Sequence, residues 1–201
     1  MEYLKSQINF IIELDKLKEV YRQTYVINTD RKENSAEHSW HLALMAILLN
    51  GYSNEPIDLF HVLKMLLIHD IVEIDTGDTF CYDKTEDLDR MEGERKAANR
   101  IFTLLPDNQA KEFQDLWNEF EDRITAEARF AAALDRIMPL LHNYYTQGKS
   151  WQEHGITSDQ VLARNRYIDD GSKFLWHYAR TLIHDAVKKQ YLQTRDNRFR
   201  T

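Results

Sequence analysis

The chain has 201 residues, of which 6 are Gly, 3 are Pro, 43% are hydrophobic and 11% are aromatic. So few turn-forming residues leave little room for a many-stranded sandwich or barrel, and the hydrophobic content excludes a long disordered arm. The net charge of −7 argues against a protein that binds duplex nucleic acid, which needs a basic surface. Cys81 is the single cysteine, so no disulfide forms within the chain.

The first residues lack the basic segment and apolar core of a secretory signal. The longest apolar run, Leu42 to Leu49, is too short to cross a bilayer. We therefore expect a cytoplasmic protein with neither a membrane nor a nucleic acid as its partner.

Apolar residues recur at helical spacing from Leu4 to Leu17, which predicts an amphipathic helix over about residues 2–20. Residues 22–34 are polar, and we expect a flexible loop there.

Asn34 and Glu37 have the spacing of a capping box, which predicts the start of a second helix that ends near Gly51. Pro56 suits the first position of the next helix. That helix is apolar on most sides from Leu59 to Ile68, so we expect it to be the buried central helix.

Segment 74–79 breaks the helical pattern and predicts a loop. Further helices are expected over about residues 86–105, 107–121, 125–147, 157–168 and 172–191. No repeat or linker interrupts the chain. The sequence predicts one all-α domain over residues 1–201, with a core over about 17–141, C-terminal helices over about 157–191 and a solvated basic tail over 192–201.

The histidine–aspartate pair His69-Asp70 ends the most apolar helix, and Glu73 follows His69 by four residues and so shares its face. His and Asp are rare in so apolar a setting unless they are paired or bind a metal. The alternative is a satisfied histidine at a capped helix end. The chain holds another such dipeptide, His184-Asp185, which has no acidic neighbours to complete a site and is expected to be structural.

Two further groups raise the significance of His69-Asp70. His38 lies in the first turn of the second helix, and Asp135 lies in an alanine-rich helix. Two imidazoles and two carboxylates make a nitrogen–oxygen set that suits a divalent first-row metal and leaves positions open for water or substrate.

The ordered set His, His-Asp and Asp on successive helices resembles the HD-domain superfamily of metal-dependent phosphohydrolases. Over about residues 17–141, five motifs in register are similar to those of its 5′-deoxynucleotidase branch: Arg22, Glu37-His38-Ser39, His69-Asp70-x-x-Glu73, Gly77-Asp78 and Leu134-Asp135.

The resemblance implies one divalent metal ion (Mn, Co, Mg, Fe, Ni or Zn), held by His38, His69, Asp70 and Asp135. It also implies a single HD-domain helical bundle, a small-molecule nucleotide substrate and a homodimer. A bound divalent cation brings the pKa of water from 15.7 toward about 7, which makes hydroxide available near neutral pH.

By the same resemblance, Glu73 activates the water, Asp78 lies at the sugar–phosphate side of the pocket and Arg22 orients the phosphate. The implied substrate-binding residues are Arg22, Gln23, Asp70, Asp78, Thr79 and Asp135. Gln23 stands where characterised bacterial relatives place a Trp beside the sugar, so a preference for deoxyribose does not follow. Tyr25 is a candidate replacement for that Trp.

No histidine lies between Asp70 and Asp135. HD proteins with two iron ions draw extra ligands from that interval, and HD triphosphohydrolases carry a catalytic histidine there, so one metal and monophosphate cleavage are favoured. The remaining alternatives are another HD phosphohydrolase activity (on a cyclic nucleotide or a nucleotide polyphosphate), a non-catalytic metal- or nucleotide-binding module, and a plain helical interaction protein.

Other histidines receive structural interpretations. His41, one turn after His38, is expected to pack or to form a hydrogen bond, and His61 is expected to be structural. His142 follows Asp135 by seven residues and is a candidate to support the metal ligands from behind.

Overall fold

The structure, a computed structural model, describes residues 1–82 and 87–195. Its α-helices are α1 (Glu2–Leu14), α2 (Ser35–Leu49), α3 (Leu59–Ile68), α4 (Glu73–Thr76), α5 (Asp87–Phe102), α6 (Asp107–Asp122), α7 (Ala126–Tyr145), α8 (Lys149–Glu153), α9 (Ser158–Asn165), α10 (Ile168–Gly171) and α11 (Lys173–Lys188). The strands β1 (Tyr21–Tyr25) and β2 (Lys32–Asn34) form an antiparallel pair, and the 3-10 turns are η1 (Asp15–Glu19), η2 (Asn50–Tyr52) and η3 (His69–Val72). The predicted all-α class is confirmed, with one small hairpin added.

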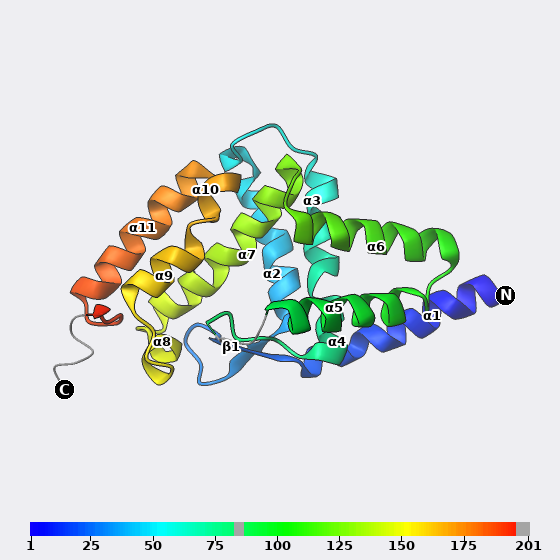
Figure 1. The fold of residues 1–201 in the computed structure, drawn as a ribbon, viewed down its shortest axis with the longest axis horizontal. Helices are drawn as coiled ribbons and strands as arrows, with labels where there is room; N and C mark the ends of the chain where they lie inside the picture. Colours follow the sequence, from blue (N-terminus) through cyan, green and yellow to red (C-terminus); the bar gives the residue numbers. More distant parts are fainter. Residues whose placement is uncertain (83–86, 196–201) are drawn as a thin grey trace.

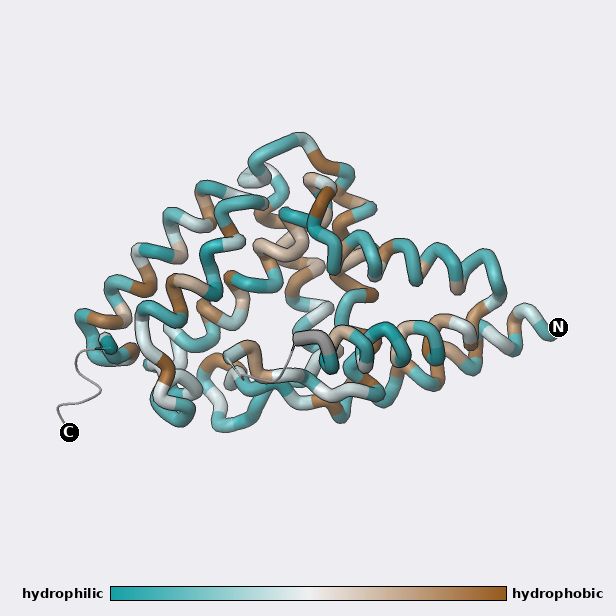
Figure 2. Tube along the Cα trace, in the orientation of Figure 1, coloured by the Kyte–Doolittle hydropathy of each residue, from teal (hydrophilic) through white to brown (hydrophobic). Residues whose placement is uncertain are grey.

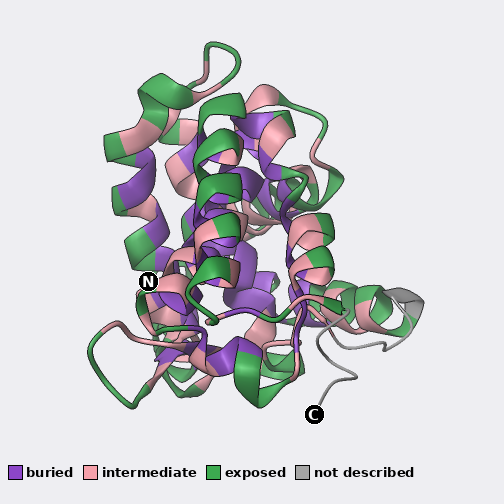
Figure 3. Ribbon diagram, turned by 90° about the vertical axis from the view of Figure 1, so that its left-hand side faces the viewer, coloured by how far each residue is buried: buried purple, intermediate pink, exposed green. Residues whose placement is uncertain are grey.

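Helix α7 runs through the middle of the molecule and packs against α2, α3, α6, α10 and α11 (Figure 1). Its alanines at 131–133 are nearly or fully buried, and small side chains let neighbouring helices approach closely. Buried segments gather between the helices, while exposed segments lie on their outer faces (Figure 3). The core therefore surrounds the helix that carries Asp135.

The outer helices are amphipathic, and hydrophobic and hydrophilic segments alternate along α6 and α11 (Figure 2). In α6 the buried residues are Leu116, Trp117 and Phe120, which recur at helical spacing. Within the described residues, no helix combines the length and the apolar character that crossing a membrane requires.

The predicted capping box is present at the start of α2. The Asn34 side chain accepts a hydrogen bond from the Glu37 amide, and the Glu37 carboxylate accepts one from the Asn34 amide. The prediction for Pro56 is wrong. Helix α3 begins at Leu59 because Asp58 caps it by accepting from the amides of Phe60 and His61.

The expected loop over residues 22–34 is wrong as well, since this segment forms the β1–β2 hairpin. Tyr21 pairs with Asn34 and Tyr25 with Lys32. The buried members of the two strands are Thr24 and Glu33, whose side chains face the helices. The hairpin places Arg22 and Glu33 directly before α2, so it belongs to the site rather than to a flexible connection.

The chain after α3 stays helical for longer than the sequence pattern predicts. Turn η3 carries His69 and Asp70, and α4 follows without a break until Gly77, whose φ of 71° ends it. Segment 74–79 is therefore helical at its start and irregular from Gly77 onward.

The C-terminal region contains the predicted helices in shorter pieces, together with α8, which the sequence pattern did not predict. Leu192 is 2% exposed, and Gln193 forms a bridge with Thr157. The tail is therefore packed at Leu192, whereas the side chain of Gln193 is exposed as expected. Its basic residues Arg198 and Arg200 lie outside the described residues.

Gly171 provides a test of the close contact between α10 and α7. A Cβ atom at this position would lie 2.2 Å from the carbonyl oxygen of Arg129 and 2.9 Å from the Cβ of Ala133. We expect Gly171→Ala to lower the free energy of unfolding by about 1–3 kcal/mol, because the backbone of α7 must shift.

Gly51 is the matched control, since a Cβ there has nothing within 4 Å. Gly51→Ala should change the free energy of unfolding by less than about 0.5 kcal/mol. Urea denaturation of the two variants measures both values, and equal effects would contradict the close packing of α10 on α7.

Candidate functional site

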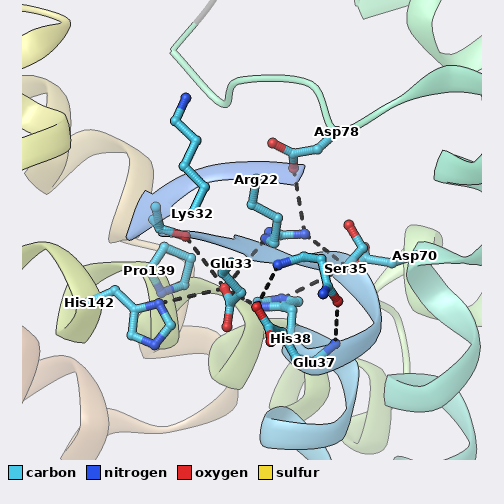
Figure 4. Close-up of polar contacts among 12 residues, drawn as sticks. Arg22, Lys32, Glu33, Ser35, Glu37, His38, Asp70, Asp78, Pro139 and His142 are labelled. Carbon is cyan, nitrogen blue, oxygen red and sulfur yellow. Dashed lines mark hydrogen bonds and ion pairs between the residues drawn. The ribbon is translucent and has the colours of Figure 1, made fainter. Parts of the chain in front are cut away.

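Three separate elements bring the predicted metal ligands together, and Figure 4 shows two of them, His38 and Asp70, near the start of α2. His38 comes from the first turn of α2, His69 and Asp70 from η3, and Asp135 from the middle of α7. The imidazoles of His38 and His69 are almost completely buried, and the carboxylates are about one-tenth exposed, at 11% for Asp70 and 13% for Asp135. Groups far apart in the sequence therefore share one dry site.

Three of these residues point a ligand atom at the same place. His38, His69 and Asp135 offer atoms that all lie within 4.8 Å of one another. Nε2 of His38 lies 3.1 Å from Asp135 Oδ1, and Nε2 of His69 lies 3.8 Å from the same oxygen. Asp70 lies beside them, with Oδ1 3.1 Å from His69 Nε2.

An oxygen atom near Nδ1 of each histidine orients its ring. Nδ1 of His69 lies 2.9 Å from the carbonyl oxygen of Leu66, an acceptor, so Nδ1 carries a proton and Nε2 is the ring nitrogen that faces the carboxylates. Nε2 of His69 is buried and has no hydrogen-bond partner among the described residues. Nδ1 of His38 lies 3.3 Å from Glu33 Oε2, an arrangement typical of the carboxylate behind a metal-bound imidazole. The donor set and the orphaned Nε2 atom fit a divalent metal ion.

Glu33 is a functional residue that the sequence reasoning missed. Its carboxylate is 3% exposed and contacts His38, Arg22 and His142. Burial alone would raise its pKa, but the neighbouring His38 outweighs burial and holds the pKa below its usual value. A carboxylate at the buried position of a short strand would indicate a functional residue. Glu33 was not identified from the sequence because a loop was predicted for this segment.

Arg22 lies in the middle of the carboxylates. Nη1 donates to Asp70 Oδ2 at 2.8 Å and lies 3.5 Å from Asp78 and 3.7 Å from Glu73. Burial opposes the charge on Arg22, yet these carboxylates raise its pKa above its ordinary value, so the guanidinium stays charged.

Glu73 is an acid of the site whose pKa lies well above its ordinary value. Burial raises its pKa first, and the negative charge of Asp70 raises it further. Its Oε2 accepts a hydrogen bond from the Ser35 hydroxyl at 2.5 Å. Burial likewise raises the pKa of Asp78. A carboxylate with a raised pKa in a cavity is well suited to accept a proton near neutral pH.

One cavity contains Arg22, Asp70, Glu73, Asp78 and Asp135. The predicted residues Gln23 and Thr79 also line it, and Gln23 accepts a hydrogen bond from Lys32 at 2.7 Å. Tyr25 is not among the lining residues, and its hydroxyl donates to Glu153. Aromatic and basic residues that the sequence reasoning did not place here complete the lining: Phe80, Tyr82, Trp151, Arg123, Arg136 and Arg164.

The other histidines lie outside the metal cluster. Nε2 of His61 lies within hydrogen-bond distance of Glu119 Oε2, at 2.7 Å. Nδ1 of His142 lies 3.6 Å from Glu33, the carboxylate behind His38. In the other histidine–aspartate dipeptide, Asp185 contacts Lys189 at 2.8 Å on the surface, and the structural interpretation of this dipeptide stays a prediction.

A family profile described as HD domain matches residues 14–176. The chain belongs to the HD-domain family. This confirms the resemblance to the HD-domain superfamily that the five motifs carry.

Curated relatives of the chain are 5′-deoxynucleotidases. The protein named 5′-deoxynucleotidase HDDC2 from Xenopus laevis is 30% identical over 138 residues, which are 68% of this chain and 67% of the relative. The human protein of the same name is 29% identical over 138 residues, 68% of this chain and 66% of the relative. The match thus spans about two thirds of the length of these relatives.

Two solved structures share the fold. A protein from Magnetospirillum magnetotacticum, described as a predicted metal-dependent phosphohydrolase, is 52% identical, covers 95% of this chain and 96% of its own, and has a TM-score of 0.91. An HD-domain phosphohydrolase from Listeria innocua has a TM-score of 0.68 at 18% identity, and the match covers 92% of this chain and 90% of that one. At that identity the second likeness supports the fold alone.

The protonation of His69 predicts a pH dependence of metal binding. Burial lowers the pKa of His69, but Asp70 and Asp135 outweigh burial and raise it to about 9 in the metal-free protein. A metal ion at Nε2 has to displace that proton, so below pH 9 the affinity rises with pH, by about tenfold per unit for one displaced proton.

Isothermal titration of Zn²⁺ into chelator-treated protein between about pH 6.5 and 8 measures this slope. His61→Gln, which removes a histidine outside the cluster, should leave the slope unchanged. An affinity that does not vary with pH would contradict the assignment of His69 as a protonated ligand in the metal-free state.

Proposed function

We propose that this protein is a metal-dependent phosphomonoesterase that hydrolyses (deoxy)nucleoside 5′-monophosphates to a nucleoside and phosphate. The observation that carries the proposal is the buried cluster of His38, His69 and Asp135 in one cavity with Arg22 and Glu73. The names of the curated relatives support the same substrate class.

In this proposal His38, His69, Asp70 and Asp135 hold one divalent metal ion, with Mn, Co, Mg, Fe, Ni and Zn as candidates. When bound, the ion neutralises charge on the phosphate oxygens and favours deprotonation of water. Imidazole and carboxylate ligands bind all of these metals. The coordination geometry of the site and the supply of metal in the cell therefore determine which metal is bound.

Arg22 binds the phosphate. A guanidinium offers several N–H donors in one plane and is well matched to phosphate oxygens. Its side chain is only 12% exposed, so water screens its charge weakly. Hydrolysis of phosphate monoesters is among the slowest uncatalysed reactions, and such fixed charges supply much of the required stabilisation.

Glu73 is the base that takes a proton from the attacking water. Its raised pKa and its hydrogen bond from Ser35 hold a carboxylate of suitable basicity inside the cavity. Asp78 and Thr79 lie on the substrate side of the cavity, together with Gln23. Because Gln23 is a hydrogen-bonding side chain in place of a Trp, both deoxyribose and ribose substrates belong in the test.

A second candidate function is another phosphohydrolase reaction at the same site, on a cyclic nucleotide or a nucleotide polyphosphate. A non-catalytic metal- or nucleotide-binding module is less well supported, because simple binding needs no buried base such as Glu73. The cytoplasmic location, the homodimer and the absence of a nucleic-acid partner stay predictions. Exposed apolar side chains on α1 and α2, among them Ile11, Ile12 and Leu48, support an association between copies.

Two substitutions test the roles of the site residues in phosphate release from deoxy- and ribonucleoside 5′-monophosphates. Asp70→Ala should remove both metal binding and activity. Glu73→Gln should retain the metal but lower kcat by about 10²–10⁴-fold, because the base is lost while the ligands stay. Metal content is measured beside phosphate release for each variant.

Asp185→Asn is the matched control, since it changes the surface histidine–aspartate dipeptide, and it should keep both metal and activity. Full activity in Glu73→Gln would contradict the role of Glu73. No phosphate release by metal-loaded wild type from any monophosphate would contradict the proposed function and favour the second candidate.

A further inference from the structure

Three arginines line the cavity from different helices. Arg123 follows the C-terminal end of α6, Arg136 lies in α7 directly after Asp135, and Arg164 lies near the end of α9. None of them belongs to the motifs that define the phosphate and metal site. Their convergence needs its own explanation.

Among the described residues these arginines have few partners. Arg136 lies 4.0 Å from Asp135, and no carboxylate oxygen of a described residue lies within 4.0 Å of the guanidinium of Arg123 or Arg164. The Nε atoms of all three are buried and have no hydrogen-bond partner there. A buried N–H group without an acceptor is costly, so each of the three sites has spare capacity for an anion.

The three charges also oppose one another. Burial lowers the pKa of Arg123 and of Arg164, and in both cases the positive charge of Arg136 is the next cause. Glu121 and Asp135 offset part of this repulsion at Arg123. Like charges gathered in a poorly solvated cavity are stabilised when an anion binds between them.

The backbone conformation of Arg123 also supports a role for its guanidinium in the cavity. Arg123 has a φ of 53°, the left-handed conformation at the end of α6, where Gly is the usual residue. A residue with a Cβ atom is less stable there than Gly. A long cationic side chain at this position is explained by a role of the guanidinium in the cavity.

Arg22 differs from the group of three in its neighbours. Arg22 lies among Asp70, Glu73 and Asp78, whereas Arg164 lies near Cys81 and Arg136. The two sets meet at Asp135, where Arg22 lies 4.0 Å from one carboxylate oxygen and Arg136 lies 4.0 Å from the other. A nucleoside monophosphate has a single phosphate, which Arg22 binds in the proposed function.

We infer that Arg123, Arg136 and Arg164 form a second anion subsite, and that the preferred substrate is a nucleotide with two phosphate groups. This inference rests on the proposed function for the first phosphate, which is cleaved. Water adds to that phosphorus, the bond from phosphorus to the ester oxygen breaks, and this oxygen leaves with a proton as a hydroxyl of the nucleoside. The second phosphate is bound without being cleaved, and it stays on the nucleoside of a 3′,5′-bisphosphate or on the released phosphate of a 5′-diphosphate.

The test measures binding of nucleotides to the metal-loaded Glu73→Gln protein by isothermal titration, so that turnover does not consume the ligand. The probes are adenosine 5′-monophosphate, adenosine 5′-diphosphate and adenosine 3′,5′-bisphosphate. We expect at least one of the two bisphosphorylated probes to bind about tenfold or more tightly than the monophosphate, because charge-assisted hydrogen bonds to the arginines are added.

Arg123→Gln and Arg164→Gln, each in the Glu73→Gln background, should remove most of this advantage while the Kd of the monophosphate changes less than about threefold. Arg180→Gln changes an exposed arginine of α11 and is the control that keeps the advantage. Arg164→Lys retains the charge and should keep part of it, which separates loss of the anion subsite from misfolding.

Equal Kd values for all three probes would overturn the inference. So would an equal loss of affinity for the monophosphate and the bisphosphates in Arg123→Gln and Arg164→Gln, because the arginines would then hold the cleaved phosphate. These outcomes are independent of the proposed function, which fails only if wild type releases no phosphate, whatever the Kd values.

Discussion

The carboxylate of Asp135 lies in the middle of α7, in a helix whose preceding turn is built from buried alanines. A carboxylate in such surroundings loses most of its hydration and has to be paired. Its partners are His38 from α2 and His69 from η3, with Arg22 of β1 at the limit of an ion pair. Hydrogen bonds from both histidines outweigh burial and hold its pKa well below the ordinary value. The pairing of Asp135 is therefore possible only when the helices and the hairpin are assembled, so the site and the tertiary structure depend on each other.

The β1–β2 hairpin supplies further side chains around the cluster of His38, His69 and Asp135. Glu33 in β2 lies 3.3 Å from Nδ1 of His38 and 3.9 Å from Arg22 in β1, so one small sheet supplies both the carboxylate behind the imidazole and the neighbouring guanidinium (Figure 4). Asn34 then caps α2, and His38 lies in the first turn of that helix. Because hairpin, cap and ligand are consecutive in the chain, a short segment sets the positions of the phosphate-binding arginine, the first histidine and its supporting carboxylate.

Local chemistry explains which of these features were predictable. The capping box at Asn34 and the apolar helix before His69 depend on neighbouring residues, and both predictions are confirmed. The start of α3 was misplaced because two adjacent signals compete, and the hydrogen bonds of Asp58 prevail over the preference of Pro56 for a first helical turn. The hairpin was missed because its strands are short and mostly polar, so their pairing depends on α2 and α7 rather than on a repeating pattern.

The residues of the candidate site likewise fall into those that the sequence predicts and those that only the folded structure shows. His38, His69, Asp70, Glu73 and Asp135 were found because each carries unusual chemistry for its apolar surroundings, and the family motif orders them. No such signal marks the three arginines of the second subsite, which are far apart in the sequence and belong to no motif. Only the folded chain shows that their side chains line one cavity and that their buried Nε atoms lack an acceptor among the described residues.

The contrast between this cavity and the whole molecule bears on how an anionic substrate is bound. The chain carries a net charge of −7, so its long-range field repels a nucleotide, although salt screens that field beyond about 8–10 Å. Inside the cavity the charges of Arg22, Arg123, Arg136 and Arg164 act at short range and with little screening, where each interaction is several times stronger than in water. Attraction thus begins only once the ligand has entered, and it depends on where the anionic groups of the ligand lie. Such a site selects by the number and spacing of phosphates rather than by charge alone, which is a property that a uniformly basic surface cannot provide.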